Sequence, residues 1–211
     1  MPNKREIRTM PAEIRAEGGE GAVITGYPIV FEQEIDLGEW REVIDAGSIG
    51  DGSVLRDVAL LANHDFGMIP MARSRRNNDS STMKLTPDQH GVAMRAALDI
   101  DGNPKSKEAY SAVNRGDITG MSFAFIVNEE RWENLDTEKP LRRIMSFGRI
   151  FEVSLVTNPA YPGTSVQAAS EGEALESVRA SLESARKKLA EEREKEQNSE
   201  RRNKALEILR R

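Results

Sequence analysis

The 211 residues of this chain are enough for one domain with its own core and an additional segment at one end. The net charge of −5 is mild, so a nucleic-acid partner is not expected, and the absence of cysteine excludes disulfides, thiolate nucleophiles and Cys-ligated zinc. No apolar run approaches the roughly 18 residues of a membrane span, and the N-terminus lacks the apolar core of a signal peptide, which predicts a soluble, unsecreted protein with no membrane partner.

Short apolar runs separated by Gly and Pro predict strands through most of the chain. Alternation in "EIRTMPAEIRA" and the β-rich run "AVITGYPIVF" begin the series, and "GVAMRAALDI", "GMSFAFIV" and "RIMSFGRIFEVSLVT" continue it. The intervening segment "GEWREVIDAGSI" predicts a short helix or an irregular turn in which Val43 and Ile44 are buried. The pattern as a whole indicates a β-rich sheet or barrel.

One helix is predicted among these strands, in "GNPKSKEAYSAVNRGD". Asn103 is a residue type that caps helix N-termini, and Pro104 fits the first helical position, where its missing N–H is not needed. Gly116 is expected to end the helix, and Tyr110 and Val113 would face the core.

Composition changes near Gln167, where a tract rich in Ala, Glu, Lys, Arg and Ser begins. We therefore divide the chain into a folded domain at residues 1–167 and a charged tail at residues 168–211. Apolar residues in the tail recur three and four positions apart, which predicts one face of an amphipathic helix or short coiled coil. They are Leu175, Val178, Leu182, Ala185 and Leu189. The tail is either a solvated, partly disordered helix or a helix that binds a partner.

The end of the apolar run "LLANHD" holds one of the two histidines of the chain, His64. A histidine beside an apolar run is often a structural residue. However, the end of a strand is a place where a rigid scaffold presents a side chain to a cleft, and imidazole suits proton transfer near neutral pH. His64 is therefore a candidate general base.

Ser122 in "DITGMSFAFIV" is the candidate nucleophile that such a base would serve. Alternation places Met121, Phe123 and Phe125 on one face of the predicted strand, and Ser122 with Ala124 on the other. Gly120 would permit close approach of a substrate backbone. The alternative is that Ser122 only fills its strand. The motif is not the G-x-S-x-G elbow of α/β-hydrolases, which argues against a serine esterase.

Glu152 stands within the otherwise apolar run "GRIFEVSLVTNPAYPGT". A carboxylate in such a strand is costly to bury unless it is paired, and a histidine would be a suitable partner. Alternation equally allows Glu152 to point to solvent on a polar face with Ser154. No spacing typical of a metal site or of a nucleotide-binding loop occurs, so no metal and no cofactor are expected.

Taken in order, "NHD", "GMSFAF" and "FEVSLVTNPAYPGT" resemble the prohead (head maturation) proteases of tailed bacteriophages, a serine peptidase family distantly similar to the herpesvirus assemblins. The resemblance covers roughly residues 5 to 167. It implies a compact β-barrel with surrounding helices, and an endopeptidase that cleaves the major capsid protein and a scaffold segment inside the assembling procapsid, in the host cytoplasm. It also implies self-cleavage and allows for self-association.

Carried over by motif, His64 matches the catalytic histidine of the family, Ser122 its nucleophile, and Glu152 the expected position of the third member. The herpesvirus relatives use a second histidine after the serine, but the other histidine of this chain, His90, precedes Ser122. Chain order therefore favours Glu152, with Asp65 as the alternative.

The same resemblance leaves several features open. The loop after Val156 would supply the oxyanion-hole N–H groups, with Ala160 or Tyr161 as candidates, because Pro159 has no N–H. The tail would be a docking element, a self-cleavage region, or both. The alternative to an enzyme is a catalytically silent assembly module of the same fold that acts through its C-terminal helix.

Overall fold

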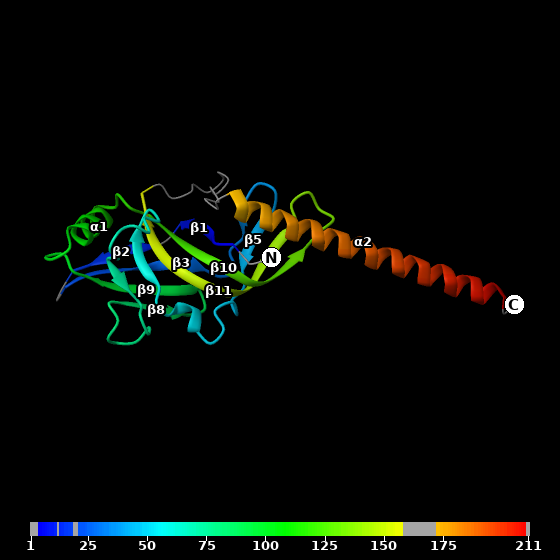
Figure 1. Cartoon of the computed structure of the whole chain (residues 1–211), viewed down its shortest axis with the longest axis horizontal. Coiled ribbons are helices and arrows are strands. Elements are labelled where there is room, and N and C mark those ends of the chain that lie inside the picture. The colour runs from blue at the N-terminus through cyan, green and yellow to red at the C-terminus, as the bar shows by residue number, and fades with distance from the viewer. Residues whose placement is uncertain (1–3, 12, 19–20, 158–171, 210–211) are drawn as a thin grey trace.

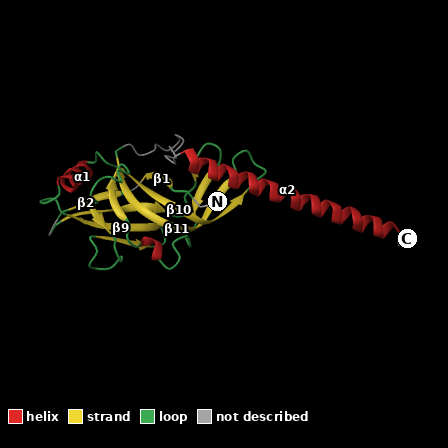
Figure 2. Cartoon of the chain, in the orientation of Figure 1, coloured by secondary structure: helices red, strands yellow, loops and turns green. Residues whose placement is uncertain are grey.

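Two β-sheets and two α-helices make up the chain in a computed structural model that describes residues 4–11, 13–18, 21–157 and 172–209 (Figures 1 and 2). Among these residues, the larger sheet has seven strands, in the order β1-β10-β11-β5-β4, with β6 attached to β11 and β7 attached to β6. Its strands are β1 (Glu6–Pro11), β4 (Ile35–Asp36), β5 (Arg41–Ile44), β6 (Ala59–Ala62), β7 (Ala72–Arg73), β10 (Gly120–Glu133) and β11 (Leu141–Val156).

The smaller sheet has four strands in the described part of the chain, in the order β2-β3-β9-β8. These strands are β2 (Ile14–Glu17), β3 (Ala22–Val30), β8 (Met83–Pro87) and β9 (Gly91–Leu98). A short 3₁₀ turn, η1 (Ser53–Leu55), precedes β6. Side chains from both sheets, including Ile24 of β3 and Met121 of β10, join one buried hydrophobic cluster. The two sheets therefore share a core.

The long antiparallel hairpin of β10 and β11 is the centre of the larger sheet. Phe123 and Phe125 of β10 pack on Phe147 of β11 in edge-to-face geometry, with ring centroids 6.0 and 5.2 Å apart. Since side chains alternate along a strand, the aromatic face of β10 lies in the core and Ser122 and Ala124 occupy the other face. The strand alternation predicted from the sequence is confirmed here.

Helix α1 (Pro104–Arg115) begins and ends where the sequence predicts. The side chain of Asn103 accepts hydrogen bonds from the backbone N–H groups of Lys105 and Ser106, and Gly116 takes the left-handed conformation at φ 78°. Val113 is buried in the core and Tyr110 is packed partly against it.

The helix or turn expected around Val43 is wrong, because residues 41–44 form the strand β5. This strand pairs in parallel with the first residues of β11, Leu141 to Ile144. Val43 and Ile44 are buried, as expected. Glu42, immediately before them, is also fully buried, and it binds two arginines of the larger sheet. Those ion pairs favour the strand, and local sequence patterns do not reveal them.

The β-rich character expected from the sequence is confirmed, but the closed barrel is not. The strand pairing in the described residues gives two separate sheets, with no ladder that joins them.

Helix α2 (Gly172–Leu209) lies across the larger sheet with its first half and projects away from the body with its second half (Figure 1). Ala174, Val178 and Leu182 are buried on the side that meets the sheet. Trp132 of β10 donates a hydrogen bond to Ser181, and Arg179 pairs with Glu39. The apolar face predicted for the tail is thus used, in its first turns, within the same chain. No helix among the described residues is both long and apolar enough to span a membrane.

Candidate active site

His64 lies just after β6, in a turn that is fixed to β11. Strand β6 runs parallel to the last part of β11, and Asn63 extends this contact, because its N–H donates to the Leu155 carbonyl and its side chain accepts from the N–H of Thr157. Asn63 and His64 both have positive φ values, 49° and 59°. This conformation costs roughly 1–2 kcal/mol for a non-glycine residue. The contacts with β11 hold the turn in place.

The imidazole of His64 is paired with Glu152 of β11. The distance from Nδ1 to the Glu152 Oε1 atom is 2.7 Å; the carboxylate is fully buried, and the histidine side chain is 17% exposed. Since an ionised carboxylate can only accept, pairing with ionised Glu152 places a hydrogen on Nδ1, and in a neutral imidazole this makes Nε2 the acceptor. The solvent-facing alternative for Glu152 is therefore wrong.

Ser154 is the third member of this group, and sequence reasoning did not assign it a role. Its hydroxyl donates to Glu152 Oε2 at 2.5 Å and accepts the backbone N–H of His64 at 3.1 Å. Ser154 is fully buried and stands two residues after Glu152, on the same face of β11. That i, i+2 spacing is the one feature of the sequence that could have pointed to it.

Ser122 lies on the neighbouring strand β10, directly opposite Ser154. Residues opposite each other in an antiparallel pair share a face, with Cα atoms about 4.5–5.5 Å apart. Ser122 therefore stands on the same face as Ser154 and Glu152, one strand away. It is fully buried.

The hydrogen bonds of the Ser122 hydroxyl in the described structure run to strand β1. The hydroxyl donates to the Arg8 carbonyl oxygen at 2.8 Å and accepts from Thr9 Oγ1 at 3.1 Å. A hydroxyl has one proton, and here it points to Arg8. The O–H bond must turn away from Arg8 before that proton can be directed to an imidazole.

The other residues considered for the third position of the triad, Asp65 and His90, have different contacts. Asp65 is exposed, and its carboxylate accepts the N–H of Gly67, which shapes the loop after His64. His90 lies in a turn of the smaller sheet, with its ring 4.7 Å from that of Tyr27 in edge-to-face geometry. The suggested oxyanion donors, Ala160 and Tyr161, lie outside the described residues.

A buried cluster of charged side chains lies beside this site, at the end of the sheet covered by α2. Arg8 of β1 and Arg142 of β11 each bind both Glu6 and Glu42, with nitrogen to oxygen distances of 2.6–2.9 Å. Glu130 completes the cluster through Arg142. Strand β1 thus connects the charged cluster with Ser122, because the main-chain carbonyl of Arg8 accepts the hydrogen bond of the Ser122 hydroxyl.

The electrostatics of this cluster are dominated by the ion pairs. Burial alone would raise the pKa of Glu6, but attraction to Arg142 and Arg8 outweighs it and holds that pKa below the ordinary value. Burial alone would likewise lower the pKa of Arg142, but the surrounding carboxylates Glu6, Glu42 and Glu130 raise it. Glu6 and Arg142 are therefore both ionised at neutral pH.

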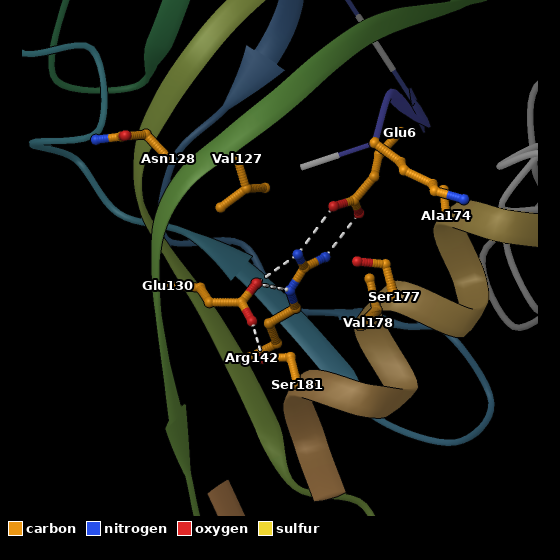
Figure 3. Close-up of a pocket in the computed structure, with 10 residues that line it drawn as sticks. Glu6, Val127, Asn128, Glu130, Arg142, Ala174, Ser177, Val178 and Ser181 are labelled. Carbon is orange, nitrogen blue, oxygen red and sulfur yellow. Dashed lines mark hydrogen bonds and ion pairs between the residues drawn. The ribbon is translucent and has the colours of Figure 1, made fainter. Parts of the chain in front are cut away.

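A polar pocket is lined by this cluster on one side and by α2 on the other (Figure 3). Arg142 lies between Glu6 and Glu130 in the view, and Ser181 of α2 contacts Glu130. No group of three metal-ligating side chains occurs among the residues the structure describes.

Comparison with known proteins gives one match. The chain matches the family described as caudovirus prohead serine protease over residues 10–178, a stretch that contains His64, Ser122, Glu152 and the first turns of α2. No curated protein and no solved structure matches it.

Proposed function

Because the chain belongs to the caudovirus prohead serine protease family, we propose that it is a serine endopeptidase that cleaves the major capsid protein and a scaffold segment inside the assembling procapsid. The observation that supports this most directly is the 2.7 Å contact between His64 Nδ1 and Glu152 Oε1, on the strand next to Ser122. The roles of these three residues, and cleavage of the chain by itself, belong to the same proposal.

In the proposed reaction, His64 Nε2 removes the proton of Ser122 as its Oγ attacks a peptide carbonyl carbon. The tetrahedral intermediate collapses when the imidazolium protonates the leaving amine, which leaves an acyl-enzyme. Water, activated by the same histidine, then hydrolyses the ester and restores the Ser122 hydroxyl. Glu152 keeps the hydrogen on Nδ1 and stabilises the imidazolium.

A second candidate function is a catalytically silent assembly module that acts through α2. The observation in its favour is the state of Ser122, which is fully buried and hydrogen-bonded to β1. If the chain is an enzyme, this is a resting arrangement that substrate must change. If the chain is an assembly module, these hydrogen bonds are the permanent structural role of Ser122.

Two measurements on the purified full chain separate these functions. The first is incubation with the major capsid protein proposed as its substrate, followed by intact mass of all products, for the wild type, Ser122→Ala and the exposed control Ser80→Ala. Discrete fragments in the wild type and control that vanish in Ser122→Ala are expected. The second is labelling with a fluorophosphonate, which is expected on Ser122. Absence of both cleavage and label in folded protein would favour the assembly module.

A further inference from the structure

Glu152, His64 and Ser154 form a closed ring of hydrogen bonds. One carboxylate oxygen of Glu152 binds the His64 imidazole, and the other accepts the Ser154 hydroxyl proton. The Ser154 oxygen in turn accepts the backbone N–H of His64. Through this ring, Ser154 holds the His64 main chain directly and the His64 side chain through Glu152.

The chemistry of the ring assigns Ser154 a task different from that of Ser122. A single contact at Oε1 leaves the Glu152 carboxylate free to rotate, because the terminal torsion of a glutamate is broad. The second bond, at Oε2, fixes the carboxylate plane. The N–H of His64 lies in a left-handed turn and would otherwise need another acceptor. Removal of the Ser154 hydroxyl frees both ends of the His64–Glu152 contact.

Ser154 is badly placed to be the nucleophile itself. Its single proton is directed to a carboxylate oxygen, and one of its two acceptor positions is taken by the His64 backbone N–H. Ser154 is directly opposite Ser122 on the neighbouring strand. The hydrogen-bonded ring therefore lies on the same face of the sheet as the proposed nucleophile. The neighbours of Ser154 therefore favour a supporting role over a reacting one.

We propose that Ser154 is a positioning residue that holds the Glu152 carboxylate and the His64 turn in the orientation needed for general-base catalysis. This rests on the proposed protease function. A hydrogen bond to a charged group, such as that of Ser154 to the Glu152 carboxylate, typically contributes about 10–100-fold. Ser154→Ala is therefore expected to lower kcat by about that factor with little change in KM.

The kinetic test is a double-mutant cycle on a peptide substrate from the capsid protein. Single variants Ser154→Ala and Glu152→Gln are compared with the double variant. If Ser154 acts through Glu152, the double variant is no slower than Glu152→Gln. Additive losses, or wild-type kcat in Ser154→Ala, overturn the proposal. Ser154→Cys keeps the size and a weak donor, so its loss should be smaller, and it takes the place of alanine if alanine does not fold.

A spectroscopic readout keeps this test independent of activity. The chain has two histidines, so His90→Gln leaves a single imidazole to observe by NMR. The Nδ1–H resonance of His64, shifted downfield by its carboxylate partner, is expected in this background and should exchange with water faster after Ser154→Ala. An unchanged resonance overturns the positioning role even in a protein that cleaves nothing. A fluorophosphonate label mapped to Ser154 instead of Ser122 overturns it as well.

These results distinguish a failure of the proposed protease function from a failure of the positioning role of Ser154. If the resonance changes but no variant cleaves or labels, the protease function fails while the structural effect of Ser154 stands. If the wild type cleaves and Ser154→Ala matches it, the protease function stands and the positioning role fails.

Discussion

The Ser122 hydroxyl donates its proton to the main-chain carbonyl of Arg8, 2.8 Å away on strand β1. This bond directs the proposed nucleophile away from His64. Strand β1 is the outermost strand on this side of the sheet, and Arg8 is fixed within the buried charged cluster. A carbonyl held by such a cluster cannot move easily, so we expect the serine side chain, and not the strand, to rotate when substrate binds.

Thr9→Val tests whether β1 restrains Ser122. Thr9 Oγ1 lies 3.1 Å from Ser122 Oγ, and valine removes this hydrogen bond while it keeps the shape. A hydrogen bond of this kind contributes about 0.5–1.5 kcal/mol, so its loss should make rotation easier and raise the rate of fluorophosphonate labelling by about 2- to 10-fold. The measurement is the second-order labelling rate constant at neutral pH. A slower rate would mean that Thr9 supports the reactive orientation of Ser122.

Glu152→Gln should lower kcat by about 10²–10⁴-fold with a small change in KM. A glutamine amide can donate to Nδ1, which moves the imidazole hydrogen to Nε2 and removes the base. The matched control is Asp65→Asn, which keeps an oxygen acceptor for the N–H of Gly67 and is expected to retain full activity. Steady-state kinetics on the capsid-derived peptide measure both. A large loss in Asp65→Asn would reverse the choice between the two acids.

Local pattern was sufficient for helix α1 and for the two faces of β10, but not for every strand of this fold. The capping residues Asn103 and Gly116 delimit α1 as predicted, because capping chemistry acts over a few residues. Alternation also separated the two faces of β10 correctly. Segment 41–44 was misassigned because Glu42 is held by Arg8 and Arg142, which are 34 and 100 residues away in sequence. Such long-range ion pairs leave no local periodicity.

The candidate site likewise divides into residues that local motifs indicate and residues whose role depends on long-range contacts. Motifs selected His64, Ser122 and Glu152 as candidates, and the structure brings His64 and Glu152 into contact. Ser154 was overlooked because a serine in a strand is chemically ordinary until its hydrogen-bond partners are known. The inward-facing charges of β1 were also invisible, since alternation in "EIRTMP" does not tell which face is buried.

The buried cluster makes the unfolding free energy sensitive to acid. The pKa of Glu6 is lower in the folded chain than in the unfolded one, so its contribution is fully present above about pH 4.3 and is lost as the pH falls through the folded value. Glu6→Gln should destabilise the protein at pH 7 by about 3 kcal/mol, since a buried pair is broken while Glu42 and Glu130 still surround Arg142.

Urea unfolding of both proteins between pH 7 and pH 3 measures this effect. The other carboxylates are common to wild type and variant, so they cancel in the difference. The gap between the two free energies should shrink as the pH falls below about 4.3, because the wild-type Glu6 becomes protonated. A gap that is constant over this range would show that Glu6 contributes through packing and not through its charge.

Two leucines on α2 test how far the helix belongs to the folded body. Leu182 is 6% exposed and Leu206 is 46% exposed on the same helix. Leu182→Ala should lower the unfolding free energy by about 2–5 kcal/mol, as for a buried leucine, whereas Leu206→Ala should change it by less than about 0.5 kcal/mol. Urea unfolding of the full chain, repeated at two protein concentrations, gives both values.

A large, concentration-dependent loss in Leu206→Ala would instead reveal that the projecting half of α2 packs against a second copy of the chain. Equal, small losses at both positions would mean that α2 is not part of the cooperative unit, and that its contacts with Trp132 and Glu39 contribute little to folding.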